Sequence, residues 1–151
     1  MLFPAAGYNR AMASARKIEK QNIAFLELYK AVDADVRTRL GSGEGVTEYI
    51  HRLEARISGV SAGKGSGKAT DSSRQEYKML KHLRWARNKL AHEVDYSTEI
   101  LKDGDFEWLE DFQKRLGRST DALSLLGKGS TGMGKKKKNT LAERLRRFFF
   151  G

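Results

Sequence analysis

The 151-residue chain contains no cysteine, has a single proline at position 4 and carries a formal net charge of +10. This length fits one domain with a real core, and the missing cysteines exclude disulfides and thiolate zinc sites. No apolar run approaches the length of a membrane span, and the first residues lack the basic region of a signal peptide, so we expect a cytoplasmic protein.

The positive charge is concentrated near the C-terminus. From Lys128 onward the chain has eight cations and one acid, so this stretch carries +7 of the total and the preceding residues carry only +3. The basic composition therefore belongs to a tail, and it says little about the surface of the folded domain.

Long proline-free stretches rich in Ala, Leu, Lys, Arg and Glu favour helices. A first helix is predicted over residues 9–40, because apolar residues recur there at steps of three and four with one gap, at Asn22. Glycines at 41, 43 and 45 then end it. A second helix is predicted over residues 46–57. The two apolar stripes are Ile18, Phe25, Tyr29, Val32, Val36 and Leu40, with Ile23 and Leu26 beside them, and Val46, Tyr49, Ile50, Leu53 and Ile57.

The second half of the chain predicts two more helices. The third begins near Ser72 or Ser73, because Glu76 stands three residues beyond Ser73 as in a capping box. The fourth covers residues 106–126, with Gly117 as a break and Trp108 off its apolar stripe, which consists of Phe106, Leu109, Phe112, Leu116, Leu123 and Leu126. The expected fold is therefore all-α, a bundle of about four helices over residues 1–126 with a flexible basic tail over residues 127–151.

A glycine-rich stretch over residues 58–70 has part of the pattern of a phosphate-binding loop. The P-loop needs Ser or Thr after Gly-Lys to bind magnesium, and here Ala69 follows Lys68. Position 62 is alanine where the pattern requires glycine. We therefore reject ATP binding and interpret the stretch as a linker, whose Lys64 and Lys68 are expected to contact an RNA backbone.

The residues best suited to chemistry stand at the end of the third helix, where Arg87, Asn88 and His92 fall within six positions. Arginine suits phosphate, histidine exchanges a proton near neutral pH, and asparagine can orient either group. Asn88 and His92 share a helix face, whereas Arg87 and His92 diverge by about 140° on a straight helix. They converge if the helix ends or bends near His92, or if a second subunit supplies the partner. Arg87 also falls among the apolar residues of the stripe formed by Tyr77, Leu80, Leu83 and Leu90.

The segment Arg87-Asn88-Lys89-Leu90-Ala91-His92 resembles the Arg-x4-His signature of the HEPN family, the higher eukaryotes and prokaryotes nucleotide-binding domain. The resemblance implies a metal-independent endoribonuclease without cofactors, a toxin or defence effector that acts on RNA as a homodimer. It implies His92 as general base, Arg87 as the group that stabilises phosphate charge and Asn88 as an orienting residue, with 2′,3′-cyclic phosphate products. An antitoxin or another protein partner is implied as well. Some toxins of the family carry Tyr two residues after the His, where this sequence has Val94.

The alternative is a non-catalytic HEPN-like module that binds RNA or a protein partner through its tail. Residues 139–151 have the pattern of a short basic amphipathic helix, which suits a nucleic acid, a protein groove or, less readily, a membrane surface. The tail cations expected to bind RNA are Lys135, Lys136, Lys137, Lys138, Arg144 and Arg147.

Overall fold

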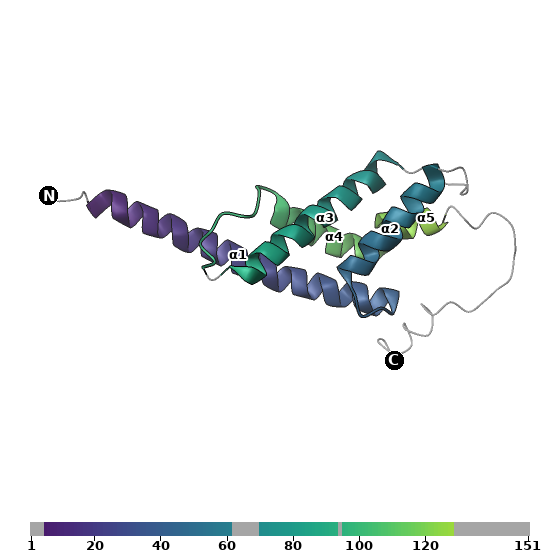
Figure 1. Ribbon diagram of the computed structural model, residues 1–151, viewed down its shortest axis with the longest axis horizontal. Coiled ribbons are helices and arrows are strands. Elements are labelled where there is room, and N and C mark those ends of the chain that lie inside the picture. The colour runs from purple at the N-terminus through teal and green to yellow at the C-terminus, as the bar shows by residue number, and fades with distance from the viewer. Residues whose placement is uncertain (1–4, 62–69, 94, 129–151) are drawn as a thin grey trace, which may run out of the picture.

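The structure, a computed structural model, describes residues 5–61, 70–93 and 95–128, and all regular elements in these ranges are helices (Figure 1). They are α1 (Ala5–Leu40), α2 (Val46–Ser61), α3 (Asp71–His92), α4 (Asp105–Arg118) and α5 (Ala122–Lys128). The prediction of an all-α bundle is confirmed. Apart from the end of α5, the predicted tail lies outside the described residues. Within the described part of the chain, no helix is long and apolar enough to cross a bilayer.

The core lies where the second half of α1 meets the other helices. α1 packs against α2, α3 and α4, and α5 packs against α2 and α3. Most of the side chains that fill it belong to the predicted apolar stripes, so the periodicity identified most of the buried residues. Its fully buried members include Phe25, Val32, Val36, Leu53, Leu80, Leu83, Leu90, Leu109 and Phe112. The first half of α1 extends beyond the bundle, at the left of Figure 1.

The turn between α1 and α2 requires glycine at position 45. Gly45 has φ +56°, and a Cβ there would lie 2.2 Å from Oδ1 of Asp33. That same carboxylate oxygen accepts a hydrogen bond of 2.9 Å from the backbone N–H of Val46. Asp33 therefore caps α2 from the preceding helix, and any side chain at position 45 would displace it.

The predicted fourth helix is two helices. α4 ends before Ser119, which adopts a left-handed conformation with φ 56°, and α5 starts after Asp121. The Oδ2 atom of Asp121 accepts a hydrogen bond of 3.1 Å from the N–H of Ser124, as an N-cap does. The predicted break at Gly117 was therefore wrong by a few residues, because the cap at Asp121 determines where the new helix begins.

The capping-box prediction for α3 was also wrong. The cap is Thr70, whose hydroxyl accepts a hydrogen bond of 3.2 Å from the N–H of Ser73. Glu76 is 3 % exposed and points into the bundle, away from the N-cap. Its carboxylate is instead part of a buried polar cluster.

This polar cluster joins all five helices. The Tyr49 hydroxyl lies 2.6 Å from Oε1 of Glu76 and 2.8 Å from Oδ2 of Asp121. Arg115 of α4 forms an ion pair with Glu76, and Arg39 of α1 forms one of 3.2 Å with Asp121. Among the described residues, no buried side-chain nitrogen or oxygen lacks a hydrogen-bond partner. We call these five residues the polar cluster.

The Tyr49 hydroxyl has short contacts to two carboxylate oxygens but carries only one proton. A hydroxyl donates once, so Tyr49 can donate to Asp121 or to Glu76 but not to both. Both contacts are hydrogen bonds when Glu76 is protonated and donates to Tyr49. Burial raises the pKa of Glu76, while the hydrogen bond from Tyr49 and the Arg115 charge act in the opposite direction. Burial therefore makes Glu76 easier to protonate than a free carboxyl group, although Tyr49, Arg115 and the N–H of Ala122 all donate to it.

We predict that Glu76→Gln flattens part of the pH dependence of stability. Because the folded-state pKa of Glu76 lies above the ordinary 4.5, its contribution to stability is complete below 4.5 and is lost as pH rises through the raised value. Glutamine is neutral at every pH. Urea unfolding should show the wild-type free energy falling relative to the variant as pH rises. Glu110→Gln, at an exposed site, should follow the wild type. Parallel curves for the wild type and Glu76→Gln would contradict the raised pKa of Glu76.

Candidate functional site

The end of α3 presents the three motif residues to solvent. α3 remains helical through His92, and the N–H of Glu93 closes the helix with a 3.3 Å hydrogen bond to the carbonyl of Leu90. Arg87, Asn88 and His92 are all exposed. The Arg87 guanidinium donates a 3.1 Å hydrogen bond to the side-chain oxygen of Asn88, so these two residues are brought together.

The sequence suggested that Arg87 interrupts the buried face of α3, and the structure shows that it does not. Ala86 occupies that place and is fully buried, whereas Arg87 points outward. With Ala86 included, the buried positions from Leu83 to Leu90 follow one another at steps of three and four residues. Tyr77 is only half-buried, at the edge of this face. Arg87 is therefore a surface residue beside an intact apolar face.

Two hollows flank the exposed side of α3. The first, of about 750 Å³, lies between α1 and α3 and contains Arg87; we call it the Arg87 hollow. The second, of about 560 Å³, runs along α3 and contains His92; we call it the His92 hollow. Because Arg87 and His92 line different hollows, a single chain does not bring these two side chains together.

Arg84 and Asn88 line both hollows and form the boundary between them. Arg84, Asn88 and His92 are spaced four residues apart, so they follow one another along one side of α3. Lys81, Arg84 and Lys89 share the His92 hollow with the histidine, and of these three cations Arg84 lies on the same side of α3 as His92. Sequence reasoning missed it, although its spacing of eight residues from His92 was a readable signal.

Tyr29 forms part of the wall of the Arg87 hollow, facing Arg84 and Arg87. Burial raises the pKa of its hydroxyl, Asp33 adds to the shift, and the charges of Arg87 and Arg84 oppose it. Tyr29 therefore stays neutral and remains a hydrogen-bond donor at physiological pH. Both guanidinium groups lie close enough to this hydroxyl for their charges to act on it.

An aromatic side chain stands in the His92 hollow. Trp85 is 51 % exposed and stacks on His82, with ring centroids 6.0 Å apart. His82 is itself fixed, because its Nε2 lies 2.8 Å from Oδ2 of Asp105 at the start of α4. Trp85 is therefore positioned by a structural histidine and keeps one face available to solvent.

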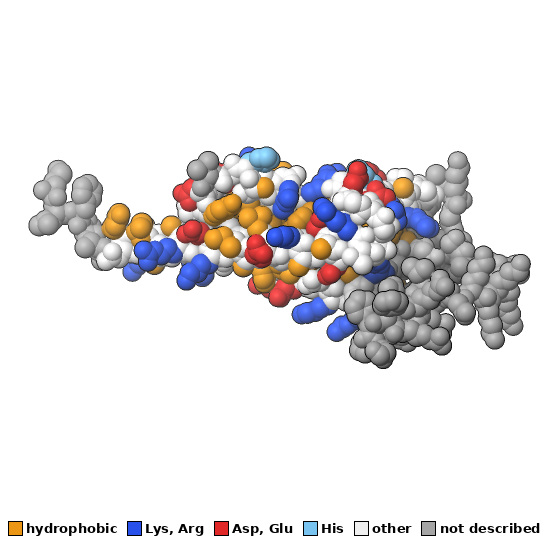
Figure 2. All heavy atoms as spheres, turned by 90° about the horizontal axis from the view of Figure 1, so that it is seen from below, with side chains coloured by type: hydrophobic (Ala, Val, Ile, Leu, Met, Phe, Trp, Pro, Cys, Tyr) orange, Lys and Arg blue, Asp and Glu red, His pale blue; other side chains and the backbone are white. Residues whose placement is uncertain are grey.

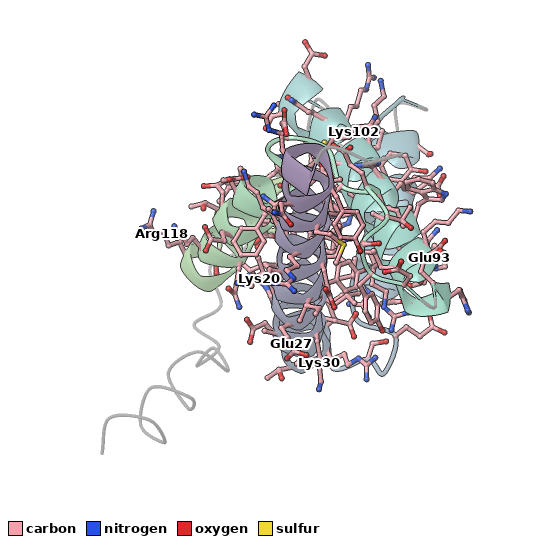
Figure 3. All side chains as sticks on the ribbon, turned by 90° about the vertical axis from the view of Figure 1, so that its left-hand side faces the viewer. Lys20, Glu27, Lys30, Glu93, Lys102 and Arg118 are labelled. Atoms are coloured by element: carbon pink, nitrogen blue, oxygen red, sulfur yellow. The ribbon has the colours of Figure 1, made fainter. Side chains whose placement is uncertain are left out.

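The connection that follows His92 is held against α1 by Asn22. Its side-chain amide donates to the carbonyls of Tyr96 and Thr98, at 2.6 and 2.8 Å. Asn22 is 1 % exposed and stands in the gap of the predicted apolar stripe. Figure 3, seen along α1 from its N-terminal side, shows Glu93 on the α3 side of α1 and Lys102 above it.

One group of potential metal ligands occurs among the described residues. Side-chain atoms of Glu44, Glu48 and His51 lie within 4.8 Å of one another on the exposed surface at the start of α2. Arg52 already donates a 2.6 Å hydrogen bond to Glu48. None of these three residues lines the His92 hollow. The other predicted RNA contacts, namely Lys64, Lys68, Lys135, Lys136, Lys137, Lys138, Arg144 and Arg147, lie outside the described residues.

Comparison with known proteins gives one match. Residues 23–146 match the model of a family of unknown function, DUF6548. No curated protein and no solved structure matches the chain.

We predict that Asn22→Ala loosens the connection after His92. The carbonyls of Tyr96 and Thr98 lose a buried donor, which should cost about 1–3 kcal/mol of unfolding free energy. Hydrogen exchange of the amides over residues 95–101 should accelerate before global unfolding does. Gln21→Ala, at the exposed neighbouring position, is the control and should leave both unchanged. Unaltered exchange in Asn22→Ala would show that the connection is held in some other way.

Proposed function

We propose that this chain, which belongs to DUF6548, a family of unknown function, is a metal-independent endoribonuclease of HEPN type that acts as a homodimer. The observation that carries the proposal is the His92 hollow, where an exposed histidine, an amide and an arginine lie on one side of α3. Arg87 adds a second guanidinium across the boundary that Arg84 and Asn88 form. A toxin or defence role belongs to the same proposal.

These side chains are not needed to hold the fold. Arg87, Asn88 and His92 are exposed, and Arg84 is half-buried at the surface. None of them forms an ion pair with a described residue. Cations that are not neutralised by carboxylates remain available for phosphate. This availability is what supports a role in binding and cleaving a polyanion.

In the proposed reaction, His92 removes the proton of a ribose 2′-hydroxyl. The 2′-oxygen attacks the adjacent phosphorus, the bond to the 5′-oxygen breaks, and that oxygen takes a proton from water. The products are a 2′,3′-cyclic phosphate and a 5′-hydroxyl. Arg84 stabilises the negative charge that develops on the phosphate beside His92, and Asn88 orients the phosphate. Arg87 binds in the neighbouring hollow, where the next phosphate of the strand would lie.

We predict that His92→Ala lowers RNA cleavage by about 10²–10⁴-fold, because general-base catalysis is worth that much. Arg84→Ala and Arg87→Ala should each lower it by about 10²–10³-fold through lost charge stabilisation. Helical content and melting temperature should stay near those of the wild type, and EDTA should not inhibit. Cleavage of a labelled single-stranded RNA, with mass analysis of the new ends, is the measurement.

Matched controls come from the same chain. His51→Ala removes another exposed histidine, and Arg74→Ala removes an exposed arginine from the other end of α3. Both should cleave RNA like the wild type. Activity that disappears with EDTA and returns with magnesium would contradict the metal-free mechanism, and full activity in His92→Ala would contradict the assigned base.

A second candidate function is RNA binding without cleavage, which Trp85 favours. Its exposed ring stands between Lys81, Arg84 and Lys89 in the His92 hollow. An aromatic ring among cations is an arrangement on which a base stacks while the backbone phosphates meet the charges. This function needs neither His92 nor a bond-breaking step.

We predict that Trp85→Ala weakens binding of single-stranded RNA by about 1–3 kcal/mol, the usual worth of one stacked base. Leu125→Ala removes a comparably exposed apolar side chain elsewhere and should bind normally. Fluorescence anisotropy at fixed salt measures both variants. If His92→Ala binds as the wild type does while no variant or wild type cleaves, the chain is a binding module; normal binding by Trp85→Ala would exclude the stacking site.

A further inference from the structure

The first half of α1 has no packing partner among the described residues. Every residue over 7–17 is exposed except Ala15, which is half-buried, and the first buried side chain is that of Asn22. Figure 1 shows this part of α1 extending past the bundle. Helices of about 12–15 residues are marginal in water without packing. A surface that covers this one would therefore stabilise it.

The exposed apolar side chains of this segment lie on one side. The described residues include five exposed large hydrophobic side chains, and Tyr8, Met12 and Ile23 of α1 are three of them. At about 100° per residue these three fall within about 60° of one another. Figure 2 shows hydrophobic side chains along the projecting end of α1, with Lys and Arg side chains beside them, and further hydrophobic side chains in the adjoining bundle. With the half-buried Ala15 between them, we call these residues the α1 stripe.

The charges of the segment are sorted around the α1 stripe. Glu19 lies within the stripe and Arg16 at its edge, whereas Arg10 and Lys17 lie on the opposite side of the helix. Figure 3 shows Lys20 on the side of α1 that faces α4, whereas Lys30 points away from the other helices. Lys30 lies five helical turns beyond Met12 and therefore on the same face of α1. The stripe itself therefore presents apolar groups with one cation and one anion, and most of the positive charge faces away.

We propose that a second copy of this chain covers the α1 stripe, with the two α1 helices antiparallel and the two-fold axis between Ala15 and Arg16. Positions 8 and 23 are equally distant from that axis, so Tyr8 packs against the partner's Ile23, twice by symmetry. The small Ala15 at the centre permits close approach of the helices. Glu19 lies one turn from the partner's Arg16, which pairs opposite charges across the interface.

The self-complementary register favours a second copy over other occupants. An RNA strand would require the cations on the stripe side, but Arg10 and Lys17 face away from it. A like helix supplies an apolar side chain for Tyr8 and Ile23 and an opposite charge for Arg16 and Glu19, and the same register places Met12 opposite the partner's Glu19. The contact uses few side chains, so its buried area is at the low end for protein interfaces. We therefore expect a weak dimer that forms only as the protein concentration rises.

The proposed interface adjoins the Arg87 hollow without depending on RNA cleavage. Leu26 and Lys30 lie on the stripe side of α1 and line that hollow. In the antiparallel register the start of the partner's α1 lies beside Leu26. The interface would be the contact of the homodimer in the proposed function. Its test reads mass and cross-linking rather than cleavage, so the interface can fail while the chain still cleaves RNA.

The first experiment measures mass by sedimentation as protein concentration rises. The wild type should move from the 17.0 kDa monomer to twice that mass. Met12→Glu and Ile23→Glu should remain monomeric, while Ala13→Glu makes the same charge change off the stripe and should still dimerise. Circular dichroism should show the bundle folded in all three. A wild type that stays monomeric at every concentration, or stripe variants that dimerise normally, would overturn the proposal.

The second experiment tests the register. Arg16→Glu and Glu19→Arg should each weaken the dimer, and the double exchange should restore it. Because the chain has no cysteine, introduced thiols report contacts without background. Ala15→Cys should form a disulfide-linked dimer alone, whereas Tyr8→Cys and Ile23→Cys should cross-link only when mixed. Cross-linking of Tyr8→Cys with itself, or no rescue by the charge exchange, would exclude the antiparallel pairing.

Discussion

The fold depends on the buried contact between Tyr49, Glu76 and Asp121. These three oxygen-bearing side chains come from α2, α3 and the start of α5, and Arg39 and Arg115 add α1 and α4. Burying two carboxylates is costly unless each is paired and hydrogen-bonded, so the helices must meet in one arrangement to satisfy them. The apolar stripes supply most of the driving force for association. The polar cluster specifies which helix ends lie together.

That constraint also positions the candidate site. With α1 and α3 fixed at the polar cluster, the C-terminal half of α3 lies against α1 around Tyr29 and Arg87, where the Arg87 hollow lies. Asn22 then holds the chain after His92 against α1. The motif residues do not pack into the core, because the core residues at this end of α3, Ala86 and Leu90, lie on the other side of the helix. Stability and surface chemistry are thus separated on one helix.

Periodicity predicted the helices and most core residues, because a buried stripe repeats in the sequence regardless of what it packs against. It could not predict Glu76, whose place in the interior depends on a tyrosine and an arginine far away in sequence. It misplaced Arg87 because Ala86, with its small side chain, is hard to distinguish from a surface residue. It placed Ile23 with the core stripe, although the residue is 44 % exposed, because a position about 200° from Phe25 lies on the far side of α1. The sequence was enough to single out Arg87, Asn88 and His92, but it could not predict which residues line the Arg87 hollow and which line the His92 hollow.

The two tryptophans stand in contrasting surroundings. Trp108 is stacked on Phe112 with ring centroids 5.6 Å apart, and the Arg115 guanidinium lies 5.2 Å from its centroid. Trp85 is half in solvent at the His92 hollow. The chain therefore carries two intrinsic optical reporters. Trp108 should emit at shorter wavelength and follow the packing of α4, while Trp85 should emit at longer wavelength, be accessible to iodide, and change only when something occupies the surface of α3.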